Sequence, residues 1–356
     1  MKMSINALQV KHGDSIVIEI EWATDKVFRI LVDGGPPGVI AKINIPALKS
    51  HQAKALTSTL DSYRDAGLSF DLTVLTHIDS DHIGGLLAAY KREDYRRVLG
   101  TDIWFNSARL IASELTTVQS DGSNFAIDQI SGPETSVKQA ADLDDLLDEL
   151  KPNRRLVIAG QQMQYEWGTI DILSPTSSQL KELAVKWEME VPSKETSNKG
   201  NDYHETLEQL QTDDEFSADT SVPNASSIAF LIKSEMGTAL LLGDALSQTV
   251  SDSLRALGYS ESNRLAVDIC KLSHHGSKGN TCSEFLSLVE VRNFIISTNG
   301  SNQLPDKRTI ARILQYCPSS KITFNYPDLL KKIFHSDELE NYCTLLNAQS
   351  GAIVAK

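Results

Sequence analysis

The amino-acid sequence predicts an α/β protein of the α+β kind, a four-layer αββα sandwich in which two mixed sheets face each other and helices cover their outer faces. The first observation is a run of apolar, β-branched segments near the start, separated by short polar turns. The second is that strands then alternate with helices, twice over. With 356 residues, 41% of them hydrophobic, we expect one domain over 1–356, with a helical and acidic insertion at about 107–222.

The first third of the chain carries the clearest strand pattern. Short apolar segments follow one another between polar turns, which is typical of a β-meander. The later run DLTVLT is apolar and β-branched and predicts a buried strand. The elements expected from this part are strands at 5–10, 15–22, 27–35, 71–76 and 102–106, and helices at 51–66 and 83–94.

The middle of the chain changes to apolar residues at helical spacing. From Glu188 to Val222 it becomes polar and acidic, and we expect a mobile surface segment there, either a solvated loop without a role or a lid that gates substrate. The expected helices are 107–115, 134–151, 178–190, 283–290 and 306–317. The expected strands are 156–160, 169–175, 226–234, 237–244, 268–277, 293–298 and 321–326.

Composition limits the classes of function. The formal net charge of −13 disfavours broad, sequence-independent binding of nucleic acid, which needs a positive surface, although a local basic groove stays compatible with it. The first residues lack the apolar core of a signal peptide, and no apolar run reaches the length of a membrane span. The four cysteines form no C-x-x-C pair. We therefore expect a cytoplasmic protein with reduced thiols and no membrane contact.

The tightest cluster of metal-type side chains is an H-x-D-x-D-H motif, with His77, Asp79, Asp81 and His82. It follows the strand expected at 71–76 and precedes a helix opened by two glycines, so we expect all four side chains in one loop. Imidazole nitrogens and carboxylate oxygens suit borderline or hard divalent ions. The alternative is a helix cap with solvated charges, which the recurrence of metal-type residues downstream disfavours.

Three further candidates follow apolar strands. Asp244 ends the strand at 237–244, where burying a carboxylate is costly without a cation or a strong donor. It is expected to bridge two metals, and the alternative is a turn residue that caps a helix beginning near Ser247. Of His274 and His275, one is expected to ligate a metal or contact the scissile group and the other to orient it. The alternative is a pair of polar residues at a strand end.

Asp33 ends a strand before two glycines, as Asp244 ends its own strand after one. It is interpreted either as a carboxylate that orients a ligand histidine or, with equal weight, as a turn-forming residue. Asp14 follows Gly13 and is interpreted as a turn residue. Four basic residues near the proposed mouth could bind phosphate oxygens, although ordinary solvated charges are the favoured interpretation for most of them. They are Lys271, Lys278, Lys307 and Arg308.

Several motifs together carry a family resemblance. They are HGDSIVIEI and LVDGG near the start, THIDSDHIGGL at 76–86, NASSIAFLI with LLLGD, and KLSHHGSKGN with FIIST. With these pieces, which run from about residue 5 to 300, the chain resembles the metallo-β-lactamase superfamily. It is most similar to the branch that includes the hydrolase domain of the bacterial DNA-uptake (competence) channel protein and its free-standing relatives.

The resemblance implies a site with two divalent metal ions, Zn or Mn, and a metal-bound hydroxide as nucleophile. The implied metal ligands are His77, Asp79, Asp81, His82, Asp244 and His275. Asp81 and His275 are the implied catalytic residues, with Asp33 and His274 supporting the ligands. Asp79 stands where many members have a second His, and this oxygen ligand makes manganese a competitor of zinc.

Within this set, His77 and Asp79 would hold one ion, and Asp81 and His82 would hold the second. Asp244 would bridge the two. This division is what the resemblance implies, residue by residue.

Two departures from the family pattern matter. Members usually supply a third His between the first motif and the bridging Asp, but between 83 and 243 the only His is His204, inside the acidic segment. One ion would then lack a protein ligand or use Asn106. Leu304-Pro305 stands where relatives carry His-Pro, and this loss would weaken one metal site or mark a chain without activity.

The function expected first is a metal-dependent hydrolase, a phosphodiesterase or nuclease that acts on nucleic acid or another phosphodiester. A hydrolase of esters, lactones or amides on the same fold is the first alternative. The second is a binding or regulatory protein with a weakened metal site, which acts with a protein partner or as a homo-oligomer.

Overall fold

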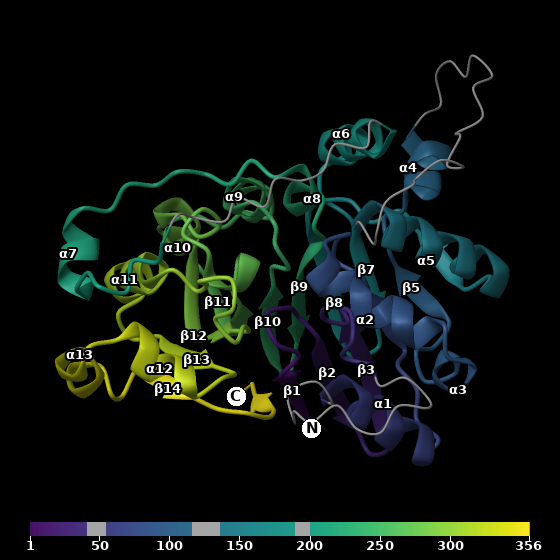
Figure 1. The fold of residues 1–356 in the computed structure, drawn as a ribbon, viewed down its shortest axis with the longest axis horizontal. Coiled ribbons are helices and arrows are strands. Elements are labelled where there is room, and N and C mark those ends of the chain that lie inside the picture. Colours follow the sequence, from purple (N-terminus) through teal and green to yellow (C-terminus); the bar gives the residue numbers. More distant parts are fainter. Residues whose placement is uncertain (41–54, 116–135, 189–199, 356) are drawn as a thin grey trace.

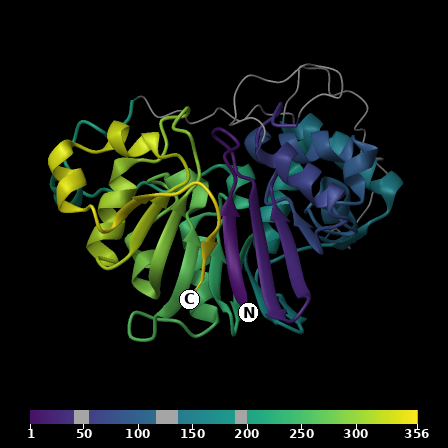
Figure 2. The ribbon, with the colours of Figure 1, turned by 90° about the horizontal axis from the view of Figure 1, so that it is seen from below.

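The computed structural model describes residues 1–40, 55–115, 136–188 and 200–355 (Figure 1). The first residues of the helix expected at 51–66 and the stretch 189–199 of the acidic segment lie outside the described residues. Two large sheets run through the middle of the molecule, with the first strands of the chain in one and most of the later strands in the other (Figure 2).

Both sheets are mixed, with an antiparallel and a parallel part. The first has the order β15-β1-β2-β3-β4-β5-β6 and is parallel from β3 to β6. Its strands are β1 (Lys2–Ala7), β2 (Ile16–Ala23), β3 (Lys26–Val32), β4 (Leu72–Val74), β5 (Asp102–Trp104), β6 (Asn153–Arg155) and β15 (Ile353–Val354). The second has the order β14-β13-β12-β11-β10-β9-β8-β7 and is parallel from β10 to β14. Its strands are β7 (Gln162–Tyr165), β8 (Gly168–Ser174), β9 (Ala229–Ser234), β10 (Gly237–Leu241), β11 (Leu265–Lys271), β12 (Val289–Ile296), β13 (Lys321–Phe324) and β14 (Leu346–Ala348).

The helices lie outside the two sheets. They are α1 (Ala55–Asp65), α2 (Ser80–Tyr90), α3 (Glu93–Arg96), α4 (Ala108–Leu115), α5 (Ser136–Leu150), α6 (Ser177–Glu188), α7 (Leu207–Thr212), α8 (Val222–Ala225), α9 (Ser247–Ala256), α10 (Ser283–Leu288), α11 (Lys307–Tyr316), α12 (Asp328–Ile333) and α13 (Ser336–Asn341). Within the described ranges, none of these helices has the length and apolar character needed to cross a membrane.

Apolar side chains fill the space between the two sheets. They also fill the space between each sheet and the helices that cover it. In β10, Ala239 and Leu241 face the core between the sheets, whereas Leu240 faces the core under the helices. A strand buried on both faces reads as a continuous apolar run, which explains its sequence. Helices α1 to α6 cover the first sheet, and α7 and α9 to α12 cover the second (Figure 2). The predicted four-layer αββα sandwich is confirmed.

Two expected elements differ from the structure for local reasons. Residues 156–160 do not form a strand, because the side-chain amide of Asn106 takes the place of a neighbouring strand. It donates to the carbonyl of Val157 (2.8 Å) and accepts from the N–H of the same residue (2.9 Å). Helix α2 begins at Ser80, so Asp81 and His82 lie in its first turn and not in a loop.

The acidic segment is packed against the fold at helix α7. Helix α7 begins with a capping box at Thr206 and lies against α11, with Leu207 and Leu210 buried between them. The interpretation as a solvated surface segment is therefore wrong for α7, because two apolar residues three positions apart give this helix one face to bury, whereas most of 212–220 is exposed as expected.

A buried ion pair holds this corner of the fold together. Lys307 Nζ of α11 lies 2.7 Å from Glu338 Oε2, and the backbone N–H of Leu207 donates to Glu338 Oε1 (2.7 Å). Burial disfavours the carboxylate, but the ammonium of Lys307 and two backbone N–H donors outweigh burial and lower the pKa of Glu338.

Replacing Glu338 by Gln is expected to lower the free energy of unfolding by roughly 3 kcal/mol at neutral pH, because the buried ammonium of Lys307 loses its partner. The folded chain has the lower carboxyl pKa. The stabilising contribution is therefore complete above the ordinary value of 4.5 and is lost as the pH falls through the folded value. Urea unfolding at neutral pH and at about pH 3 measures both effects, with the exposed Glu340→Gln as control. Equal unfolding midpoints for Glu338→Gln and wild type at neutral pH would contradict the prediction.

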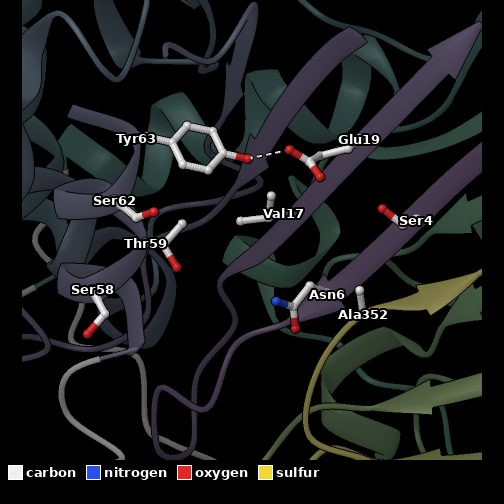
Figure 3. Close-up of a pocket in the computed structure, with 9 residues that line it drawn as sticks. All are labelled: Ser4, Asn6, Val17, Glu19, Ser58, Thr59, Ser62, Tyr63 and Ala352. Atoms are coloured by element: carbon white, nitrogen blue, oxygen red, sulfur yellow. Dashed lines mark hydrogen bonds between the residues drawn. The ribbon is translucent and has the colours of Figure 1, made fainter. Parts of the chain in front are cut away.

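A cavity of about 340 Å³ lies on the outer face of the first sheet, between α1 and the strands β1 and β2 (Figure 3). Hydroxyl and amide side chains form most of its wall, and Tyr63 donates a hydrogen bond of 2.8 Å to Glu19. None of the predicted metal-type side chains lines this cavity. It is therefore separate from the cluster that forms at the strand ends.

Candidate metal centre

The predicted site residues gather at the carboxyl ends of strands from both sheets. In the first sheet, Asp33 follows β3 and His77 follows β4. In the second, Asp244 follows β10, and His274 and His275 lie in a 3₁₀ turn (Ser273–Gly276) after β11. Neighbouring parallel strands end at the same edge of a sheet, which is why residues far apart in the sequence meet here.

Glycines bring the first turn of α2 against the end of β3. A Cβ atom on Gly85 would lie 1.9 Å from the carbonyl oxygen of Gly34, so backbone packs on backbone at this contact. Asp79 stands at the N-cap of α2, but its side chain caps no backbone N–H. His77 and His82 are buried. The alternative of a helix cap with solvated charges therefore does not describe this turn.

Asp244 lies at the centre of the cluster. Its Oδ2 is 3.7 Å from His77 Nε2, 3.5 Å from His82 Nε2 and 3.9 Å from His274 Nε2. Tetrahedral zinc with bonds of about 2.0 Å keeps its ligand atoms about 3.3 Å apart, so each of these nitrogens lies close to the distance from Asp244 Oδ2 at which two atoms can bind the same cation. The N-cap of α9 is Leu246, so Asp244 is not the cap of that helix.

The buried polar atoms of the cluster fit a bound cation. Asp244 Oδ1 and the Nε2 atoms of His77 and His82 are buried and have no hydrogen-bond partner among the described residues. Buried polar groups are normally paired, and bound metal ions would satisfy these three atoms. The chemistry of the donors, imidazole nitrogen with carboxylate oxygen, suits zinc and manganese.

Asp33 fixes the orientation of two histidines. His82 Nδ1 donates to Asp33 Oδ2 at 2.8 Å. His77 Nδ1 donates to Thr76 Oγ1 (3.0 Å), whose hydroxyl donates to the same Asp33 oxygen (2.8 Å). Both rings therefore carry a proton on Nδ1 and turn the Nε2 lone pair toward Asp244. Asp33 has a φ of 58°, so the geometry is compatible with the turn role as well as the orienting role.

His275 lies on the side of Asp81 and His82. Its Nδ1 donates to the carbonyl of Ser297 (2.7 Å), and its Nε2 lies within hydrogen-bond distance of Asp81 Oδ2 (3.3 Å). The ring centroids of His82 and His275 are 5.4 Å apart. His275 Nδ1 is also 3.4 Å from Asp14 Oδ1, on the side away from the solvent.

Asp14 is one of the site residues that sequence reasoning missed. Among the described residues, one group of side chains has its ligand atoms within 4.8 Å of one another, and it consists of Asp14, His82, Asp244 and His275. Asp14 is buried and pairs with the buried ammonium of Lys271. Its interpretation as a plain turn residue is wrong, and Lys271 is neither solvated nor open to phosphate. The available signal was a charge directly before one apolar strand and a lysine ending another, since buried charges need partners.

His274 has a separate set of partners. Its Nδ1 is 3.1 Å from Asn280 Oδ1 and 3.6 Å from Asp219 Oδ2. Asn280 Nδ2 donates to Asp219 Oδ2 (3.0 Å), and Asn224 Nδ2 donates to the same oxygen (2.7 Å). Asp219 belongs to the acidic segment, where nothing in the sequence distinguished it from its acidic neighbours.

Carboxylates dominate the electrostatics of the cluster. Burial disfavours the charged imidazole of His82, but the surrounding carboxylates, Asp244 first, outweigh burial and raise the pKa of His82 well above its ordinary value. Burial and the carboxylate of Asp14 oppose each other in the same way at His275, and the pKa of His275 rises to about 10. The negative charge thus calls for cations, either protons on the imidazoles or metal ions.

One side of the cluster is open to solvent. The side chains of Asp79, Asp81 and His274 are 29%, 22% and 28% exposed, whereas those of His77 and His82 are fully buried. His12 is half-buried beside this opening, and burial lowers the pKa of His12 although Asp81 opposes it. The cluster is therefore reached from solvent on the side of Asp79, Asp81 and His274.

Other residues singled out from the sequence do not join the cluster. His204 is exposed, and both amide atoms of Asn106 are used on the backbone of Val157. The remaining basic residues lie near carboxylates. Lys307 is buried, so neither phosphate binding nor solvation describes it, whereas the side chain of Lys278 is 36% exposed. These pairs are Lys278 with Asp306 (3.7 Å), Lys307 with Glu338 (2.7 Å) and Arg308 with Asp214 (3.8 Å).

Comparison with known proteins found similarity to solved structures alone. No protein-family model and no curated protein matches the chain. The metallo-β-lactamase fold protein YhfI from Bacillus subtilis is 12% identical with a TM-score of 0.41, and all of both chains is covered. A possible metal-dependent hydrolase from Veillonella parvula is 10% identical with a TM-score of 0.42, and 99% of each chain is covered. A diphosphatase of the PhnP family is 9% identical with a TM-score of 0.41, covering 100% of this chain and 98% of that one.

These similarities are distant and say nothing about activity. The narrower resemblance to the DNA-uptake branch stays a prediction. What the chain itself shows is a two-sheet αββα sandwich with a buried His/Asp cluster, able to hold a metal ion, at the carboxyl ends of its strands.

Proposed function

We propose that this protein is a metal-dependent hydrolase that cleaves phosphodiester bonds with two divalent ions, Mn²⁺ or Zn²⁺. The observation that carries the proposal is the convergence on Asp244, where three imidazole Nε2 atoms from two sheets face one carboxylate oxygen. The proposed metal ligands are His77, Asp79, Asp81, His82, Asp244 and His275. Their carboxylate-rich composition favours hard ions and oxygen-rich substrates.

Two ions in this cluster would lower the pKa of a water molecule and offset the charge that develops on the attacked phosphoryl group. The protein's own part is to hold the geometry. Asp33 keeps the Nε2 lone pairs of His77 and His82 toward the centre, and the carbonyl of Ser297 does the same for His275. Asp81 lies at the open side, so we assign Asp81 and His275 to the region nearest the reacting bond.

The test is hydrolysis after removal of metal with a chelator and reloading with Mn²⁺ or Zn²⁺. Bis-p-nitrophenyl phosphate and a labelled single-stranded DNA represent small and polymeric phosphodiesters, and p-nitrophenyl acetate and a lactone represent esters. Turnover of either phosphodiester is expected. Asp81→Ala is expected to lower kcat by at least about 100-fold. Loss of a residue that only supports a metal ligand costs up to about 100-fold, and loss of a direct ligand is expected to cost at least as much.

The other outcomes separate the alternatives. Turnover of the esters without the phosphodiesters would replace the proposal by an ester hydrolase on the same fold. Fewer than one ion per chain after reloading, with no turnover of any substrate, would overturn it in favour of a binding protein with a weakened site. Circular dichroism of Asp81→Ala is the control for folding.

A further inference from the structure

We propose that His274 and His275 are both metal ligands, one for each ion. His275 completes the ligand set of the ion held by Asp81 and His82, and His274 completes the ligand set of the ion held by His77 and Asp79. Asp219 of the acidic segment acts as a positioning residue for His274. This inference rests on the proposed two-ion site.

The backbone of the turn separates the two imidazoles. His274 and His275 have φ values of 46° and 53°, so two consecutive residues other than glycine adopt the left-handed conformation. This conformation is strained for residues other than glycine, and such strain persists where the surrounding structure requires it. The ring centroids are 6.1 Å apart and the ring planes are inclined by 65°. The turn therefore presents two imidazoles in different directions from adjacent positions.

The partners of the two rings assign them to different ions. His275 Nε2 lies 3.3 Å from Asp81 Oδ2, and His275 belongs to the compact group with His82. His274 is outside that group, yet its Nε2 lies 3.9 Å from Asp244 Oδ2, the same oxygen that His77 Nε2 approaches at 3.7 Å. His82 Nε2 approaches this oxygen as well, at 3.5 Å, but His82 belongs with His275 to the compact group. We therefore assign His274 to the ion on the His77 side.

The hydrogen bonds of His274 are those of a ligand histidine. Asn280 Oδ1 accepts from His274 Nδ1, because the amide nitrogen of Asn280 is engaged by Asp219 and by the carbonyl of Asp244. Asn224 Nδ2 also lies 3.3 Å from His274 Nδ1. The Asn280 oxygen at 3.1 Å and the Asp219 carboxylate at 3.6 Å can only accept, so together they favour a proton on Nδ1, with Nε2 turned toward Asp244. The same tautomer occurs in His77, His82 and His275, where a second partner also fixes the ring.

Asp219 gives the acidic segment a role. Its carboxylate accepts from the N–H of Ser221 and from the side-chain amides of Asn224 and Asn280, and it is 3.6 Å from His274 Nδ1. It thereby holds both amides against the His274 ring. The segment at 200–222 contains His204, but that residue is exposed. The segment contributes the support of a ligand from the following turn in place of a ligand of its own.

The experiment measures the number and affinity of bound ions. Chelator-treated wild type, His274→Asn, His275→Asn, Asp219→Asn and His204→Asn are titrated with Mn²⁺, followed by calorimetry, metal analysis and paramagnetic resonance. Asparagine tolerates the left-handed conformation, so the His274→Asn chain is expected to fold. Wild type and His204→Asn are expected to bind two ions with a spin-coupled spectrum. His274→Asn is expected to keep one uncoupled ion, and Asp219→Asn to weaken one ion by about 10- to 100-fold.

Double variants decide which ion is affected. His274→Asn with Asp79→Asn removes two ligands of one ion, so the second ion is expected to bind as in His274→Asn alone. His274→Asn with Asp81→Asn removes one ligand from each ion, and binding of both ions is expected to be lost. Two tightly bound ions in His274→Asn would overturn the inference and leave the proposed function standing. A wild type that binds no ion would overturn the proposed function itself.

Discussion

Asp244→Asn is expected to lower kcat for phosphodiester hydrolysis by on the order of 10³-fold and to weaken the binding of both ions. A metal site contributes several kcal/mol of stabilisation to the transition state, and each 1.36 kcal/mol corresponds to a factor of ten in rate. Asp244 Oδ2 is the atom that the Nε2 atoms of His77, His82 and His274 share. An amide in its place keeps the shape but removes the bridging negative charge.

The measurement is kcat for bis-p-nitrophenyl phosphate at saturating Mn²⁺, together with the number of bound ions. Asp252→Asn on the exposed face of α9 is the matched control and is expected to behave as wild type. Asp244→Asn with wild-type kcat and two bound ions would show that this carboxylate does not bridge the two ions.

Lys271→Met is expected to cost about 3–5 kcal/mol of the free energy of unfolding in metal-free protein. Both members of the Lys271–Asp14 pair are buried, and removing one leaves the other charge uncompensated. The pair also joins the two sheets, since Lys271 ends β11 and Asp14 precedes β2. Its loss is therefore expected to loosen the contact between the halves at the site.

The double variant Lys271→Met with Asp14→Asn separates charge from packing. Neutralising both partners is expected to recover most of the lost stability, because replacing a whole buried pair is often nearly neutral. Lys321→Met, at an exposed position at the start of β13, is the control and is expected to change stability by less than about 0.5 kcal/mol. Urea unfolding in the presence of a chelator measures all four proteins. A Lys271→Met chain as stable as the control would refute the argument.

Much of the centre was predictable because strand ends are local features of a sequence. An apolar run shows where a strand stops, and the side chain that follows lies at the edge of the sheet, as Asp33, His77 and Asp244 do. The alternation of strands and helices likewise fixed the layers. These conclusions need no knowledge of which strand lies beside which.

The residues that were missed depend on contacts between distant segments. The pairing of Asp14 with Lys271 joins two sheets, and Asp219 reaches His274 from a segment whose composition suggested solvent. Local patterns do not reveal which edges meet. The expected strand at 156–160 failed for a related reason, because Asn106 competes for its backbone from elsewhere in the chain.

The site residues lie at the carboxyl ends of the strands, so the opposite end of the sandwich carries none of the proposed ligands. The turns at 24–25 and 235–236 join antiparallel strands there, at the starts of β3 and β10. Changes of sequence or length at these turns lie a full strand away from the ligands. The turns at this end can therefore accept affinity tags, fused domains or inherited insertions. The sequences at the two ends of the sandwich are free to change at different rates.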